Sequence, residues 1–221
     1  MQRVGKSRVF GLVFVVALLV AMMLNTRFVT PEELANIGPK KFDPRQTAQS
    51  LFKKASAEFG DRAAPLPEVI AGIQSDPAAA AEKFDAVAPN SDTLVFAVTA
   101  TGTVTKASAG SVQLKVDGVP EQTLVIVPVT TAINGTVLRD SMGFEFADAP
   151  GQSAFQFVGD ELKKLMQAAV ADGVGDPGAL KGKTVTVVGA LSVVGNGPQP
   201  KAKPVNIQPV NIQPVSMQEG S

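Results

Sequence analysis

The densest run of polar side chains outside a helical pattern is NGTVLRDS, at positions 134–141. A guanidinium such as that of Arg139 can donate two parallel hydrogen bonds to a carboxylate or a phosphate. The run follows an apolar strand pattern and precedes a helical one, so we expect it on a connection, where functional residues are common. The candidate site for a ligand or a partner is therefore Asn134, Gly135, Thr136, Arg139 and Asp140.

The same stretch also fits a purely structural role, and we favour that interpretation. Arg139 and Asp140 could pair with each other, Gly135 could adopt a positive φ, and Thr136 could cap the turn. The stretch is kept as the best candidate site because no other part of the sequence gathers as many polar groups outside a helix face.

The residue inventory excludes much of the chemistry that enzymes use. The 221 residues include no Cys, His, Trp or Tyr. Without Cys there is no thiolate nucleophile, disulfide or Cys-based metal site. Without His there is no imidazole base or imidazole ligand. We therefore predict no catalytic residues, no metal site and no cofactor.

Three further kinds of site are weighed and set aside. A glycosidase needs two carboxyl groups that face each other across a cleft, whereas Glu145 and Asp148 read as solvated loop charges. The glycines of the strand half lack the spacing of a phosphate-binding loop. Nucleic acid is excluded as a partner because Lys+Arg and Asp+Glu balance at 20 each, and single-strand binding uses aromatic side chains in a basic groove.

The first 27 residues read as a targeting segment. Arg3, Lys6 and Arg8 precede an uncharged run, Val9–Leu24, and Arg27 follows it. The run is somewhat shorter than the roughly 20 residues of a spanning helix, but it could cross a thin or locally compressed bilayer. The basic flank predicts a cytoplasmic N-terminus and an exported remainder.

Two fates of this segment remain open. No small-x-small cleavage site follows the apolar run, so we favour an uncleaved signal anchor over a cleaved signal peptide. No Cys follows it either, which excludes a lipid attached through sulfur. The expected location is the inner membrane, as a single-pass protein with a periplasmic C-terminal domain.

The pattern changes from helical to strand-like near residue 92. Over 28–92, Asp43-Pro44 and Asp76-Pro77 each place an N-cap before a Pro at the first helical position. Gly60 is expected to end the first of these helices. From Thr93 the apolar period falls to two, which is typical of strands.

The strand half predicts an OB-like domain over 93–217. Three meandering strands are followed by a long helix over 153–171 and a strand over 183–194, in which Gly189 marks a bulge or bend. The fold class is therefore α+β: a transmembrane or signal-anchor helix, a small helical segment, and an OB-like five-stranded β-barrel with a helix between strands three and four.

The end of the chain repeats the sequence PVNIQ, starting at Pro204 and again at Pro209. One copy is expected to supply the fifth strand, and its prolines predict an edge position. Which copy does so stays open. Residues 218–221 are predicted to be a disordered tail.

Short blocks with a specific order and spacing are spread over residues 42–215. They are Ser50-Leu51-Phe52, Leu66-Pro67, Ser75 to Ala80, Phe84, Gly102-Thr103-Val104, Ile133 to Asp140, Phe144-Glu145-Phe146, Asp148, Gln152, Asp176-Pro177 and Leu180 to Val185. Together they resemble a family of predicted periplasmic lipoproteins of bacteria, a domain of unknown function often encoded beside sugar ABC transporters.

Two departures from that family matter. Its members look like lipoproteins, whereas this chain has no Cys, so attachment falls to the apolar run. Where the family tends to carry Trp or Tyr, this chain has Phe52, Phe84 and Phe155. These keep the packing but remove the hydroxyl and indole donors that a sugar-binding role would use.

The residue inventory and the apolar run predict a non-enzymatic, membrane-anchored periplasmic protein, and the resemblance implies that it is accessory to a sugar ABC transporter. Its partners would be the inner membrane and a permease or binding protein of that transporter. The alternative is a periplasmic small-ligand module, in which the 133–148 connection and the barrel mouth hold a sugar or an anion. Biochemical activity, ligand identity and oligomeric state stay open.

Overall fold

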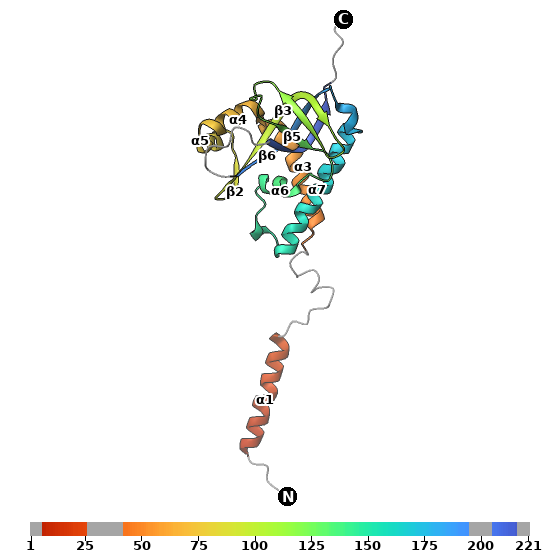
Figure 1. Ribbon diagram of the computed structural model, residues 1–221. Coiled ribbons are helices and arrows are strands. Elements are labelled where there is room, and N and C mark those ends of the chain that lie inside the picture. The colour runs from red at the N-terminus through yellow and green to blue at the C-terminus, as the bar shows by residue number, and fades with distance from the viewer. Residues whose placement is uncertain (1–5, 26–41, 195–204, 216–221) are drawn as a thin grey trace. The chain divides into compact units, whose positions relative to one another are not determined.

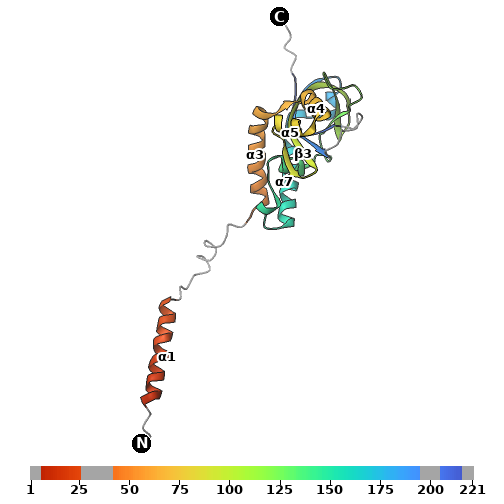
Figure 2. The ribbon, with the colours of Figure 1, turned by 90° about the vertical axis from the view of Figure 1, so that its left-hand side faces the viewer.

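The computed structural model describes residues 6–25, 42–194 and 205–215 (Figures 1 and 2). The chain divides into two compact units, residues 1–41 and 42–221, and each is described by itself. The predicted 218–221 tail lies outside the described residues.

The described part of the first unit is one helix, α1 (Lys6–Asn25). The large apolar side chains between Phe14 and Met23 have exposed fractions of 50% to 72%. A helix was expected here as a membrane span. Within the described ranges, however, no helix combines the length and the hydropathy needed to cross a membrane.

Three helices begin the second unit: α3 (Pro44–Arg62), α4 (Leu66–Ser75) and α5 (Pro77–Lys83). The predicted Asp-Pro starts are confirmed, because Asp43 Oδ1 accepts hydrogen bonds from Arg45 N (2.9 Å) and Gln46 N (3.1 Å). Asp76 caps α5 in the same way. The predicted end at Gly60 was wrong. A glycine ends a helix by turning left-handed, whereas α3 continues to Arg62 and ends at the extended Ala63.

Five strands of the second unit pair in a circuit. They are β3 (Thr93–Ala107), β4 (Ser111–Val116), β5 (Val125–Pro128), β6 (Thr184–Val194) and β7 (Val205–Pro214). The order is β3-β4-β5-β7-β6, and β6 pairs again with β3. Only β5 and β7 are parallel within this circuit. Two short strands, β1 (Ala64–Pro65) and β2 (Val87–Asn90), pair with β3.

The connection between β5 and β6 carries the helices that matter for the site. They are α6 (Gly135–Ser141), η1 (Phe146–Asp148), α7 (Gln152–Val174) and η2 (Pro177–Leu180). The long helix between the third and fourth long strands is confirmed. Helix α6 replaces the predicted loop. Figures 1 and 2 show α7 beside α3, and both contact the sheet. The fold is thus α+β with a mixed sheet.

Both copies of the PVNIQ repeat contribute to the same strand, β7. Its first residues, Val205 and Asn206, pair with β5, and the stretch from Ile207 to Pro214 pairs with β6. The strand as a whole is therefore not at an edge, because it pairs with β5 and with β6, but Pro209 and Pro214 both lie in the stretch that pairs with β6 and not with β5.

A bulge explains how β7 tolerates its central proline. Val188 of β6 faces Asn211, but Gly189 faces Pro209, so Val210 is an extra residue. Proline lacks an N–H for the ladder, and a bulge is one of the places in a sheet where it is found. The bulge predicted at Gly189 is confirmed.

A single cluster of buried apolar side chains holds the second unit together. It includes Phe59 of α3, Val69 of α4, Phe96 of β3, Met166 of α7 and Ile212 of β7. Side chains from both sides of residue 92 are therefore packed in one core.

Candidate functional site

The five candidate residues lie at the start and along the length of α6. Asn134 is the N-cap: its Oδ1 accepts hydrogen bonds from the N–H (3.0 Å) and the hydroxyl (2.7 Å) of Thr136. The cap is thus Asn134 rather than the predicted Thr136. An Asn at this position satisfies an N–H that the first turn would otherwise leave unpaired.

Gly135 allows α6 to press against α7. A Cβ added at this position would overlap the carbonyl oxygen of Gly159 and the amide nitrogen of Lys163. Gly135 is also buried. The predicted positive φ was wrong, because only close approach of two backbones requires glycine here.

Arg139 is buried, with only 7% of its surface exposed. Its Nε and Nη2 donate to Asp140 Oδ1 at 2.9 and 2.8 Å, and its Nη1 donates to the Phe155 carbonyl at 3.2 Å. The guanidinium carbon lies 3.6 Å from the centre of the Phe155 ring. Two edges and one face of the guanidinium are therefore occupied by the protein itself.

The backbone of the candidate stretch is also tied to the end of the chain. Asn134 N donates to the buried Gln208 Oε1 of β7 at 2.7 Å. The structure thus brings all five predicted residues together, and the polar contacts of Asn134, Thr136, Arg139 and Asp140 are directed to one another or to neighbouring elements. What they do in this arrangement is hold α6 between α7 and β7.

Glu145 and Asp148 share one turn instead of facing each other across a cleft. Asp148 Oδ2 accepts a hydrogen bond from Glu145 N at 2.8 Å, as part of a capping box around η1. Both residues are exposed. Their separation along a single turn does not give the opposed carboxyl groups of a glycosidase.

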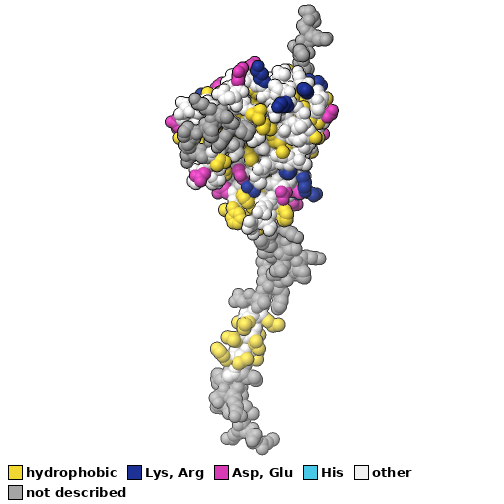
Figure 3. Space-filling view, in the orientation of Figure 1, with side chains coloured by type: hydrophobic (Ala, Val, Ile, Leu, Met, Phe, Trp, Pro, Cys, Tyr) yellow, Lys and Arg dark blue, Asp and Glu magenta, His cyan; other side chains and the backbone are white. Residues whose placement is uncertain are grey.

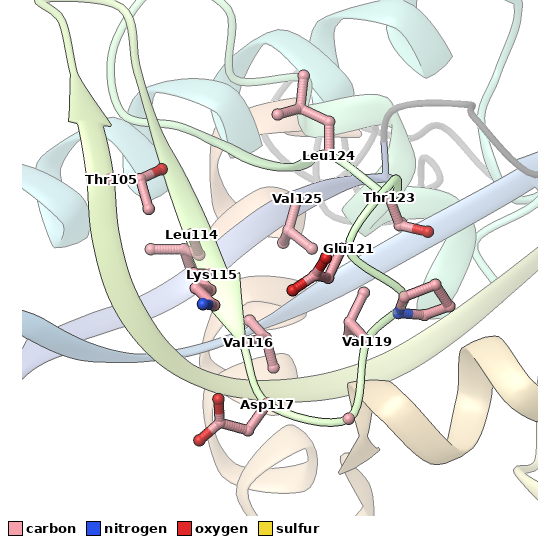
Figure 4. A pocket seen from close by; sticks show the side chains of 12 residues that line it. Thr105, Leu114, Lys115, Val116, Asp117, Val119, Glu121, Thr123, Leu124 and Val125 are labelled. Atoms are coloured by element: carbon pink, nitrogen blue, oxygen red, sulfur yellow. The ribbon is translucent and has the colours of Figure 1, made fainter.

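A hollow of about 570 Å³ lies beside the connection between β4 and β5. Figure 4 shows Lys115 of β4 and Glu121 of the connection on either side of it, with Thr105, Asp117 and Thr123 nearby. Lys115, Asp117 and Glu121 are all exposed. The hollow is open and polar, and its volume is within the range of small-ligand sites.

Phenylalanine rings form a second feature, which we call the aromatic end. It consists of Phe42, Phe144, Phe146 and Phe155. Phe144 stacks on Phe155 with ring centres 6.0 Å apart, and it also contacts Phe42 (6.5 Å). Phe146 meets Phe155 edge-on at 5.7 Å. Phe146 is 56% exposed.

An ion pair network joins α3 to α7 next to the aromatic end. Glu161 contacts Lys164 at 2.6 Å and Arg45 at 3.5 Å. The hydrogen bond from Lys164, helped by the charges of Lys164 and Arg45, lowers the pKa of Glu161 below its ordinary value of 4.5. The network thus favours the ionised carboxylate and links the first turn of α3 to the middle of α7.

Sequence reasoning missed both the hollow and the aromatic end. The hollow depends on how the connection after β4 folds back, which no residue pattern indicates. The aromatic end had a readable signal: Phe144 and Phe146 precede the start of one helix, and Phe155 lies in its first turn.

Among known families, the sequence model for a "predicted periplasmic lipoprotein (DUF2291)" matches residues 13–213. The chain belongs to this family. No curated protein matches the sequence. The solved structure of an OB-fold protein from Thermotoga maritima is similar, with a TM-score of 0.62 and 17% sequence identity. The match covers 80% of this chain and 100% of that one, and it supports the OB-type fold of this family member. Membership indicates an extracytoplasmic location for this chain.

Proposed function

We propose that this family member is a non-enzymatic, membrane-attached periplasmic protein that assists a sugar ABC transporter through protein contacts. The observation that carries the non-enzymatic part is the engagement of Arg139, whose guanidinium is already bound by Asp140 and Phe155. The strongest anion donor of the candidate site is therefore directed inward.

The transporter link is supported by the family resemblance in the sequence. Chemical crosslinking in cells, followed by pull-down from solubilised membranes, tests it directly. We expect a permease or a sugar-binding protein to be captured by the wild-type chain. Capture of neither, in cells that express the transporter, would contradict the proposed partner.

Membrane attachment is supported by the basic residues before the Val9–Leu24 run, by its lack of charge and by the absence of Cys for a lipid. We propose a cytoplasmic N-terminus, with the anchor retained. A C-terminal alkaline phosphatase fusion should be active and should sediment with membranes. Release of a shortened, active fusion into the soluble periplasm would show cleavage and refute the anchor.

The alternative function is a ligand-binding module. We interpret the closed circuit of five strands as an OB-type barrel that would carry this module. The hollow between Lys115 and Glu121 favours it. A thermal-shift screen of sugars and sugar phosphates on the full chain tests it. Stabilisation that K115A or E121Q abolishes, and that R139A leaves in place, would establish this function at the hollow.

A further inference from the structure

A second hollow, of about 290 Å³, lies at the turn of the β3–β4 hairpin, and we call it the lysine hollow. Its lining consists of Lys106, Ala107, Ser108, Ser111, Gln113 and Lys181. Among the described residues, its charged lining is thus two ammonium groups and no carboxylate. The β4–β5 hollow differs, because Asp117 and Glu121 line it beside Lys115 (Figure 4). Figure 3 shows positive and negative side chains interspersed over the face that it draws, so a hollow with charges of one sign is a local feature.

A bulge in β3 turns Lys106 towards the lysine hollow. The register passes over Thr105, so that Lys106 pairs with Gln113 and not with Val112. Paired residues of neighbouring strands lie on the same face of a sheet. Val112 is fully buried, whereas Gln113 is half-buried on the opposite face. In an unbroken register Lys106 would point into the core, and the bulge instead directs its ammonium group outward beside Gln113.

A tight turn before β6 brings Lys181 to the same hollow. Lys183 N donates to the Leu180 carbonyl oxygen at 2.9 Å, and Gly182 has a φ of 81°. Since Lys181 has φ −55° and ψ 127°, this is a type II turn, whose third position favours glycine. The turn is tied to β3, because Gly182 N donates to Val104 O and Val104 N donates to Lys183 O, both at 2.9 Å. Backbone hydrogen bonds therefore fix the place of Lys181 beside β3.

The polar groups of the lysine hollow are not engaged by the rest of the described chain. In the described ranges, no carboxylate forms an ion pair with Lys106 or Lys181, nor with the exposed Lys183 of the same turn. Within those ranges the hydroxyl of Ser111 and the side-chain amide of Gln113 also form no hydrogen bond. The hollow therefore offers two charged donors and two neutral ones to a ligand from outside.

We infer that the lysine hollow is a binding site for a phosphate group, held by the ammonium groups of Lys106 and Lys181 and by the side chains of Ser111 and Gln113. A phosphate monoester carries about −1.5 to −2 charges at pH 7, which two ammonium groups match, whereas a single carboxylate would leave one of them unmatched. The phosphate belongs either to a soluble sugar phosphate or to a lipid headgroup. This site goes beyond the proposed accessory role and lies apart from the β4–β5 hollow of the alternative function.

Isothermal titration calorimetry with inorganic phosphate tests the site on the full chain in a nonionic detergent and a phosphate-free buffer. We expect a Kd of about 1 mM, which is the scale of a few charge-assisted hydrogen bonds at an exposed site. K106Q and K181Q should each weaken binding about tenfold, because each removes one charged donor. K53Q is the matched control, since Lys53 of α3 is equally exposed but does not line the hollow. In about 0.1 M salt it should change the Kd less than about twofold.

No saturable binding of phosphate up to about 20 mM would refute the site. An equal loss in K53Q would also refute it, because the effect would then come from the net charge. Binding that K115Q abolishes and K106Q leaves in place would assign the anion to the β4–β5 hollow instead. Capture of no transporter partner would leave this site standing, since none of these titrations involves a partner protein.

Two phosphate esters distinguish the sources of the phosphate. Glucose 6-phosphate that binds more tightly than inorganic phosphate would support a soluble sugar phosphate. Dihexanoyl phosphatidic acid that binds more tightly would support a lipid headgroup, and equal affinities would mean that the phosphate group alone is recognised. Glucose without phosphate should not bind at this hollow. Displacement of inorganic phosphate by glucose would overturn the assignment, because recognition would then not depend on the phosphate charge.

Discussion

At the scale of single residues, the guanidinium of Arg139 is a buried charge that contacts several partners within the protein. Asp140 neutralises it along one edge, the Phe155 carbonyl accepts from another, and the Phe155 ring covers one face. A charge with this little exposure is tolerated only when its donors are satisfied. Its role here is to fix the start of α7 against α6, and the same contacts turn it away from a ligand.

Replacement of Arg139 should therefore lower stability. We expect R139A to reduce the free energy of unfolding by roughly 2–3 kcal/mol, because it leaves Asp140 partly buried without its partner. R139K should cost about 1–2 kcal/mol, since an ammonium cannot reproduce the flat guanidinium contacts. Urea unfolding of the full chain, followed by circular dichroism, measures both. A change below about 0.5 kcal/mol for R139A, as is usual for a surface substitution, would contradict the structural role.

Gly135 offers a second test at the same scale. G135A should destabilise the protein by at least roughly 1–3 kcal/mol, because the added methyl overlaps the backbone of Gly159 and Lys163. The matched control is G60A, also in a helix, where an added Cβ meets nothing within 4 Å. G60A should raise stability by about 0.4–1 kcal/mol. Thermal denaturation of the two variants side by side gives the comparison, and equal effects would contradict the close packing of α6 on α7.

At the scale of elements, the sequence predicted those whose signals are local. Asp43-Pro44 and Asp76-Pro77 determine where α3 and α5 start, because a cap acts within four residues. The strands from Thr93 onward follow the period of two in the same way. Helix α6 was not predicted, since its seven residues are stabilised by α7 and β7 rather than by their own pattern.

The candidate site also shows that sequence reasoning detects local signals but not contacts between distant residues. Its residues are together, as expected, because all five lie within residues 134–140 of the chain. Their roles depend on partners that are distant in sequence, such as Phe155 and Gln208, and no spacing within the stretch could indicate those contacts. The register of β7 against β6 could not be predicted from the sequence either, because it depends on the bulge opposite Gly189.

The link between α3 and α7 should depend on pH. The pKa of Glu161 is lowered in the folded protein, so its ionisation stabilises the fold above the ordinary value of 4.5, and this contribution is lost as the pH falls through the lowered pKa. We expect E161Q to be less stable than the wild type at neutral pH, and this difference should shrink as the pH falls through the lowered pKa of Glu161.

Urea unfolding at a series of pH values measures this difference. Added salt should shrink it at neutral pH, because exposed charges are screened. E58Q is a suitable control, since Glu58 pairs with Lys54 within α3 only and does not reach α7. A difference for E161Q that does not shrink as the solution is acidified would show that the side chain acts through packing rather than charge.

At the scale of the whole molecule, one core joins the helical segment to the sheet. Phe59 of α3 and Leu66 of α4 are fully buried in the same cluster as Val98 and Val187 of the sheet. Helices as short as α4 and α5 are marginal on their own in water. The helical segment predicted over 28–92 therefore depends on the sheet for its stability. Without these helices, apolar side chains of the sheet would be exposed to solvent.

This shared core predicts cooperative unfolding of the compact unit. F52W places a single fluorophore on α3, before residue 92, and F155W places one on α7, after it; both replace half-buried rings of a chain that otherwise lacks Trp. Each variant should unfold in urea with one transition, and in each the fluorescence midpoint should coincide with the midpoint from circular dichroism, which averages over the whole unit. Two separate transitions, or an α3 probe that changes before the bulk of the secondary structure, would mean that the helices and the sheet are independent domains joined near residue 92. Coincident midpoints would mean that neither part can unfold without the other. A destabilising substitution on α3 would then also destabilise the aromatic end, through the shared core.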